Sequence, residues 1–138
     1  MSTLFVAASP GLQAWAADVG LTKIVYAVGI ADQPGEEAIE TLNAGRHAGR
    51  NDWKLIGEQA VDGLSEADAL DRLRAKETLI DPRYYPQIKG APGIVKVKLA
   101  NVENALMVQR ALAGELTKTL KVKPADIAAY LIRNAQGR

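Results

Sequence analysis

The chain has 138 residues, of which 48% are apolar, and 17 basic and 16 acidic side chains give a formal net charge of +1. This size fits one globular domain with a core, and the near-neutral charge does not indicate a general nucleic-acid binder, so any basic patch must be local. Because there is no cysteine, disulfides, thiolate nucleophiles and cysteine-ligated metals are excluded, and one histidine, His47, excludes a His-rich metal site. Without a basic leader or about 20 consecutive apolar residues, we expect a cytoplasmic protein with no membrane segment.

The first part of the chain predicts two strands and one helix. Thr3 to Ala8 is a β-branched and aromatic run that a Ser-Pro-Gly turn interrupts, which is typical of a strand. The alanine-rich segment from Leu12 to Gly20 has no clear apolar period and is predicted to be a loop. Lys23 to Ile30 is almost continuously apolar, as expected of a strand covered on both faces, and a helix is predicted from Gly35 to about Gly45.

The middle of the chain predicts two more strands and one helix. Trp53 to Val61 reads as a third strand, and Ser65 caps a helix that runs to about Glu77. Leu79 to Gly93 holds three prolines and two glycines and is predicted to be an irregular connection. Ile94 to Leu99 alternates apolar and basic residues and is predicted to be a strand added at the sheet edge, with its lysines facing away from the core.

Two helices are predicted at the end of the chain. Asn101 caps one that continues through Ala113, Lys118 to Lys123 is a basic linker, and the last helix begins at Pro124. Together the elements predict an α/β (α+β) fold, in which the first two strands and Trp53 to Val61 form a small, mainly antiparallel sheet flanked by helices. Residues 1–116 form this domain, and residues 117–138 add a linker and a C-terminal helical extension packed on it.

Four short sequence words resemble those of the GIY-YIG nuclease superfamily, the fold of phage homing endonucleases. They are Thr3-Leu4-Phe5-Val6 in the first strand, Ala27-Val28-Gly29 in the second, Ile39 to Gly45 in the first helix and Ser65 to Leu70 at a later helix start. The resemblance covers roughly Thr3 to Arg110 and implies a GIY-YIG-like fold.

The residues that active members use are missing from the matching positions. In such members two strand tyrosines, a helix arginine and a later glutamate position a divalent metal and a water. Here the corresponding positions fall at Phe5 to Ala7, Ala27, about Ala38 and about Leu73, and Tyr26 is one residue away, on the opposite strand face. The resemblance therefore implies a degenerate member with no catalytic residue, metal or cofactor, which does not hydrolyse DNA or RNA.

The candidate ligand site is a groove bounded by the loop Arg46 to Asp52, the strand end Ala27 to Ile30 and the loop Arg83 to Pro92. Loops at strand ends carry most function on such scaffolds, and basic and aromatic side chains suit phosphate contacts and base stacking. The candidate nucleic-acid-binding residues are Arg46, His47, Arg50, Lys54, Arg83, Tyr84, Tyr85, Lys89, Lys96 and Lys98.

The polar and aromatic loop residues each have a structural alternative. His47 is a candidate base or phosphate contact, but a lone histidine in a polar loop is more often solvated. Tyr84 and Tyr85 suit base stacking, but an aromatic pair between prolines also anchors a long loop to the core.

The charged candidates on strands and helices have alternatives as well. Lys96 and Lys98 suit phosphate contacts, but lysines on an edge strand also discourage aggregation. Glu66 and Asp68 could pair around a metal, yet capping and the helix dipole explain acidic residues in a first helical turn.

Three functions remain open. The first is a non-catalytic GIY-YIG-like module that binds DNA or RNA, which the resemblance favours. The second, which the near-neutral charge favours, is a protein-interaction or homo-oligomeric module in which alanine-rich segments, the Trp15 region and the last helix pack on a protein partner or a second copy. The third is an active metal-dependent nuclease whose displaced site includes Glu66 or Glu103.

Overall fold

A five-stranded antiparallel sheet is the centre of the molecule. The computed structural model describes residues 2–20, 24–80, 85, 88, 93–112, 114 and 122–136. Within them the strands lie in the order β3-β1-β2-β5-β4, and each neighbouring pair is antiparallel. The predicted small α+β fold with a mainly antiparallel sheet is confirmed. The strands are β1 (Ser2–Ala8), β2 (Val25–Ala31), β3 (Lys54–Val61), β4 (Thr78–Leu79) and β5 (Ile94–Lys96).

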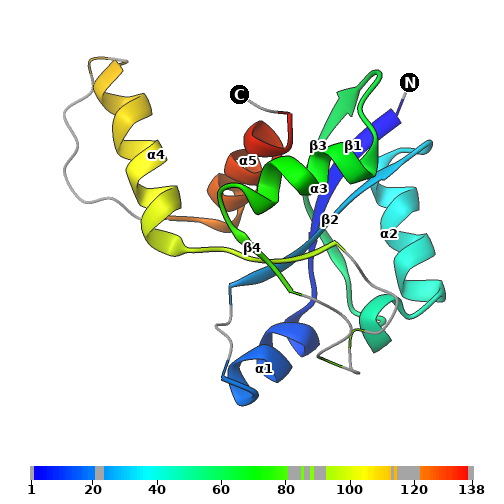
Figure 1. Ribbon diagram of the computed structural model, residues 1–138. Helices are drawn as coiled ribbons and strands as arrows, with labels where there is room; N and C mark the ends of the chain where they lie inside the picture. The colour runs from blue at the N-terminus through cyan, green and yellow to red at the C-terminus, as the bar shows by residue number, and fades with distance from the viewer. Residues whose placement is uncertain are drawn as a thin grey trace.

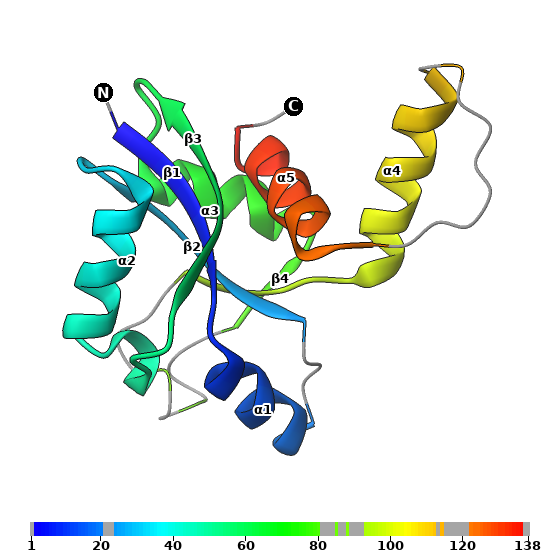
Figure 2. The same ribbon diagram turned by 180° about the vertical axis from the view of Figure 1, so that it is seen from behind.

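Helices cover both faces of this sheet, as Figures 1 and 2 show from opposite sides. One face carries α1 and α2, the other carries α3 and α5, and α4 lies beyond α5. The helices are α1 (Pro10–Asp18), α2 (Gly35–Ala44), α3 (Glu66–Arg74), α4 (Leu99–Leu112) and α5 (Pro124–Ala135), with a short 3-10 turn η1 (His47–Gly49) after α2.

The alternation of side chains along β1 divides the core in two. Leu4 and Val6 are fully buried in the cluster under α3 and α5, whereas Phe5 and Ala7 are buried in the cluster under α1 and α2. Because successive strand residues point to opposite faces, a strand with two buried faces must be apolar at every position. The prediction of such a strand for Lys23 to Ile30 is confirmed by β2, apart from its exact ends.

The segment predicted to be a loop from Leu12 to Gly20 is instead the helix α1, so that prediction is wrong. Ser9 is its N-cap, with the Oγ accepting a hydrogen bond from the Leu12 backbone N–H at 3.1 Å, and Pro10 occupies the first turn. Leu12 and Ala16, four residues apart, are buried against the sheet. The Ser-Pro-Gly sequence that suggested a turn therefore starts a helix. Serine and proline are common in turns, and they also suit the N-cap and the first turn of a helix.

The region from Leu79 to Leu99 also differs from its prediction. Leu79 belongs to β4, which pairs with β5, so the irregular connection does not begin there. β5 ends at Lys96, and Leu99 already belongs to α4. β5 is not an edge strand, because β4 covers its outer side through the register of Thr78 with Lys96. Two residues give too weak a pattern for β4 to be recognised from sequence.

The remaining helix predictions hold with shifted ends. α3 begins after the Ser65 cap as expected, but it ends at Arg74 and not near Glu77. α4 begins at Leu99, so that Asn101 lies in its first turn and is not its cap. α5 begins at Pro124 as predicted and packs on the sheet with Leu131 fully buried.

Two glycines allow chain segments to approach closely. At Gly57 in β3, a Cβ atom would lie 2.8 Å from the Cβ of Ala128, so α5 packs directly on the strand backbone. At Gly93, a Cβ atom would overlap the carbonyl oxygen of Val28, and the Val28 N–H donates to the Gly93 oxygen at 2.9 Å. The Val28 backbone cannot move aside as a side chain can, so an added Cβ atom is tolerated less at Gly93 than at Gly57.

Gly93→Ala is expected to lower the free energy of unfolding by about 1–3 kcal/mol, since the added methyl group forces β2 and the start of β5 apart. Gly45→Ala is the matched control, because Gly45 has φ −86° and its nearest contact to an added Cβ would be an ordinary 3.4 Å. Urea unfolding followed by circular dichroism measures both. Equal stability of the two variants would contradict the close approach at Gly93.

Candidate functional site

The three segments that bound the predicted groove are only partly described. Arg83, Tyr84 and Lys89 lie outside the described residues. Tyr85 is half-buried against the α1–α2 cluster, and its ring meets Trp15 edge-on with the centroids 5.7 Å apart. This packing supports the anchoring alternative for Tyr85.

The loop Arg46 to Asp52 is hydrogen-bonded to the start of α1. The Asp52 carboxylate accepts hydrogen bonds from the hydroxyl of the fully buried Ser9 and from the Gly11 backbone N–H, the latter at 2.9 Å. These bonds, above all the one from Ser9, hold the pKa of Asp52 below its ordinary value, and the Arg50 guanidinium adds to the effect. Asp52 therefore ties this loop to the N-terminus of α1, and Arg50 lies half-buried beside it.

His47 is half-buried and packs on Trp53, with the ring centroids 5.6 Å apart. The indole N–H of Trp53 donates to the His47 carbonyl at 2.9 Å, and the Asn43 side chain bonds both backbone groups of Trp53. Burial lowers the pKa of His47, and the negative charge of Glu66 opposes this shift. The ring is thus part of the packing around Trp53. The sequence, by contrast, favoured a solvated ring.

The described basic candidates do not converge on one surface. Lys54 lies in β3 opposite Ala8, which packs toward α3 and α5, whereas Lys96 lies on the same side of β5 as Ile94, toward α1 and α2. Three strand spacings also separate β3 from β5, which is about 14 Å at 4.8 Å each. Lys98 lies beyond β5, and its backbone N–H donates to Glu77. Arg46 is exposed in the loop beside α2.

The positions matched to the nuclease residues do not form one site either. Phe5, Ala27 and Ala38 are buried in the α1–α2 cluster, while Leu73 is fully buried on the other face of the sheet. Tyr26 is also on that other face, as a shift of one residue requires. These side chains cannot face one substrate.

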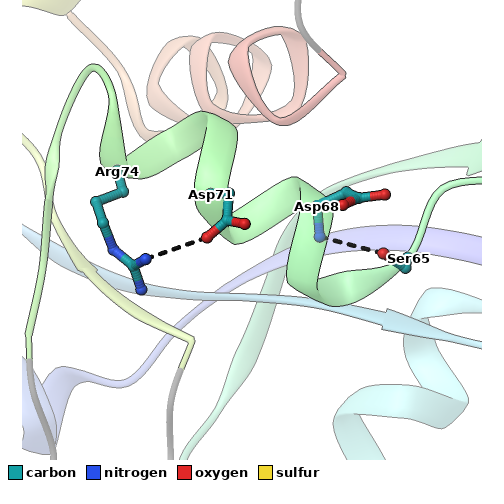
Figure 3. A network of polar contacts seen from close by, with 4 residues as sticks. All are labelled: Ser65, Asp68, Asp71 and Arg74. Atoms are coloured by element: carbon teal, nitrogen blue, oxygen red, sulfur yellow. Dashed lines mark hydrogen bonds and ion pairs between the residues drawn. The ribbon is translucent and has the colours of Figure 1, made fainter.

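Glu66 and Asp68 serve the start of α3. Figure 3 shows the Ser65 hydroxyl accepting from the Asp68 backbone N–H, and one turn later Asp71 pairs with Arg74 at 3.1 Å. Glu66 reaches the edge of β2, where its Oε1 accepts from the Ile30 N–H at 3.4 Å. In the described part of the chain, no three His, Cys, Asp or Glu side chains gather so as to hold a metal ion.

A cavity of about 700 Å³ lies between α4 and α5, where the sequence suggested no site. Leu106, Val108 and Leu112 line it from α4, and Tyr130 and Arg133 line it from α5. Organic ligands occupy pockets of about 300–1,000 Å³, so its size suits a small molecule. A cavity between two helices depends on how far apart they pack, so the sequence contains little indication of this site.

A buried carboxylate lies beside this cavity. Only 6% of the Glu77 surface is exposed, and the carboxylate accepts hydrogen bonds from the Lys98 N–H at 2.6 Å, the Asn101 amide at 2.7 Å and the Tyr130 hydroxyl at 2.5 Å. Burial raises the pKa of Tyr130, and Glu77 raises it further. Glu77 thus joins the connection between α3 and β4 to the start of α4 and the middle of α5.

Several large apolar side chains of α4 are exposed, and two of them, Val108 and Leu112, line the cavity. Among the described residues, five large hydrophobic side chains are exposed, and all except Val19 belong to α4: Leu99, Met107, Val108 and Leu112. Leu112 is 84% exposed. Single exposed apolar side chains are common, but a cluster on one helix marks an interaction surface.

Comparison of the chain with protein-family models, with curated proteins and with solved structures gives no significant match. The GIY-YIG resemblance therefore stays a prediction. No helix in the described ranges is both long enough and apolar enough to cross a membrane.

The single histidine allows a direct test of the His47 environment. Its imidazole C–H signals should titrate in NMR with a midpoint below 6.5, because burial disfavours the charged ring. Glu66→Gln should lower the midpoint further by removing a negative charge, whereas Asp68→Asn in the same helical turn should not. A midpoint at or above 6.5 would show that the ring is solvated.

Tyr130→Phe should destabilise the protein by about 1–2 kcal/mol near neutral pH, since it removes a hydrogen bond to a buried carboxylate. The folded phenol has a raised pKa, while the unfolded phenol ionises near 10.0. The contribution of Tyr130 is therefore complete below that value and is lost as the pH rises above it. Urea unfolding of both proteins across this range measures the difference, and a constant difference would contradict the Glu77 contact.

Proposed function

We propose that the chain is a non-catalytic interaction module that associates through α4, with a second copy of itself as the partner. The observation that carries this proposal is a row of exposed, mostly small or apolar side chains along α4, with Met107 51% exposed. Among the described residues outside α4, Val19 is the one large hydrophobic side chain that is exposed.

The exposed face of α4 has the spacing of a helix-pairing seam. We define the α4 seam as Ala100, Asn104, Met107 and Ala111, which are all exposed and are spaced four, three and four residues apart. This is the spacing of a and d positions in paired helices, and small residues at both ends permit close approach.

The seam is complementary to itself. The order four, three, four reads the same in both directions, so a second α4 running antiparallel places Ala100 opposite Ala111 and Asn104 opposite Met107. A two-fold axis makes both contacts twice, as in most homodimers. No charge lies in the seam, and each Asn104 faces Met107 of the other copy, which lowers the affinity of the contact.

The nucleic-acid hypothesis stays a prediction that draws less support from this geometry. Its described basic residues lie on different strands and faces, and Asp52 lies next to Arg50. Strong phosphate binding needs several cations that act together. A short DNA duplex that fails to bind even at low salt would remove it.

Sedimentation equilibrium tests the interaction module. A pair of 14-residue helices is smaller than a standard interface, so we expect a weak dimer with a Kd of about 10 μM to 1 mM. Met107→Lys should make the protein monomeric over this range, because a buried lysine lacks a partner. Val19→Lys is the matched control, because Val19 is 46% exposed at the end of α1, and it should dimerise as the wild type does.

Two outcomes would contradict the proposal. One is a wild-type protein that stays monomeric up to about 1 mM, where a contact of about 4 kcal/mol would be half formed. The other is a dimer that Met107→Lys and Val19→Lys weaken equally.

A further inference from the structure

We propose that the cavity between α4 and α5 binds a small organic carboxylate with an unbranched apolar chain. This site goes beyond the proposed dimer, because it lies on the side of α4 that faces α5. Of the seam residues, Asn104 lines the cavity, whereas Ala100, Met107 and Ala111 do not.

The walls of the cavity provide the apolar contact. Leu106, Val108 and Leu112 line it from α4, and Ala129 lines it from α5. Ala129 is exposed and small, so it leaves open the space that a larger side chain would fill. An alkyl chain laid along this groove removes apolar surface from water on both partners.

One end of the cavity provides hydrogen-bond donors. Asn134 lines the cavity, and its Nδ2 atom is buried and makes no hydrogen bond, although the amide is near enough to lower the pKa of the Tyr130 phenol. A buried donor without a partner is costly, which a ligand acceptor would relieve. Arg133, the preceding residue, also lines the cavity and is exposed.

The charges around the cavity favour an anion at this end. Among the described residues, the one ion pair joins Arg74 and Asp71, so Arg133 has no carboxylate partner there, and its guanidinium donates to the side-chain oxygen of Gln109. Asp126 lines the cavity seven residues earlier in α5, about 10 Å along the helix, and its carboxylate accepts from the Lys123 N–H at 2.9 Å. Arg133 thus has no acidic partner and the Asn134 Nδ2 atom has no acceptor, while the Asp126 carboxylate is occupied.

The buried Glu77 does not compete for the donors at this end. Its two oxygens already accept three hydrogen bonds, from Lys98, Asn101 and Tyr130. The Tyr130 proton points to Glu77 and is not offered to a ligand. The donors that remain for the carboxylate of a ligand are the Asn134 amide and the N–H groups of Arg133 that do not face Gln109.

NMR titration of the isotope-labelled full chain with sodium octanoate tests the site, with octan-1-ol as the uncharged comparison. Octanoate should shift the backbone amides of Leu106, Val108, Ala129 and Arg133 in a saturable manner, and octan-1-ol should bind more weakly. Arg133→Gln should raise the Kd for octanoate by about tenfold or more, the effect of losing one charged hydrogen bond. Arg74→Gln, which changes an arginine outside the cavity, should leave the Kd unchanged.

Two further variants separate this site from the dimer. Ala129→Leu should block octanoate by filling the groove, while Met107→Lys should bind octanoate as the wild type does. Thermal unfolding confirms that each variant is folded, and Arg133→Gln decides the question if Ala129→Leu is not. Shifts that do not saturate, equal binding of octan-1-ol, or equal Kd values for Arg133→Gln and Arg74→Gln would overturn the proposal.

Discussion

The need to cover both faces of the central strands determines where most helices lie. In β1 and β2 neighbouring residues are buried in different clusters, such as Tyr26 under α3 and α5 and Ala27 under α1 and α2. Since neither face can remain in water, the chain must supply a helical layer on each side. Four helices meet this requirement. α4 is the exception, because it packs on the core mainly through Val102 and Leu106, and this leaves the α4 seam exposed and a cavity between α4 and α5.

Glu77 explains why α4 can hold a defined position without lying on the sheet. A buried carboxylate is unfavourable unless hydrogen bonds replace its hydration, and here three donors from separate parts of the chain do so. Two of these donors, the Lys98 N–H and the Asn101 amide, lie at the junction of β5 and α4. The third, the Tyr130 hydroxyl, comes from α5. The same network therefore fixes the angle at which α4 leaves the sheet and shapes one wall of the cavity.

Polar groups in and beside the loop Arg46 to Asp52, which bounds the predicted nucleic-acid site, are largely occupied in holding loops together. Asp52 binds the start of α1, Asn43 binds the backbone of Trp53, and His47 packs on the Trp53 ring. Such contacts use up donors and acceptors that a ligand would need. By contrast, the exposed apolar residues of α4 and the unpaired Asn134 amide have no such use within the described structure. Surfaces left unsatisfied by the fold are where interaction is most favourable.

The sequence alone determined the pattern that local chemistry controls. Continuous apolar runs gave the central strand, Ser65 and Pro124 gave the starts of α3 and α5, and together these predicted the antiparallel α+β class. Only the tertiary structure decided the rest, because it depends on which segments meet. The serine before Pro10 starts a helix because Leu12 and Ala16 find the sheet, and two residues become β4 because β5 lies beside them. Glu77, which reads as an ordinary charged residue in sequence, is buried because three distant donors surround it. The seam and the cavity likewise follow from the position of α4, which hydrophobic spacing cannot specify, since spacing determines burial and not the partner.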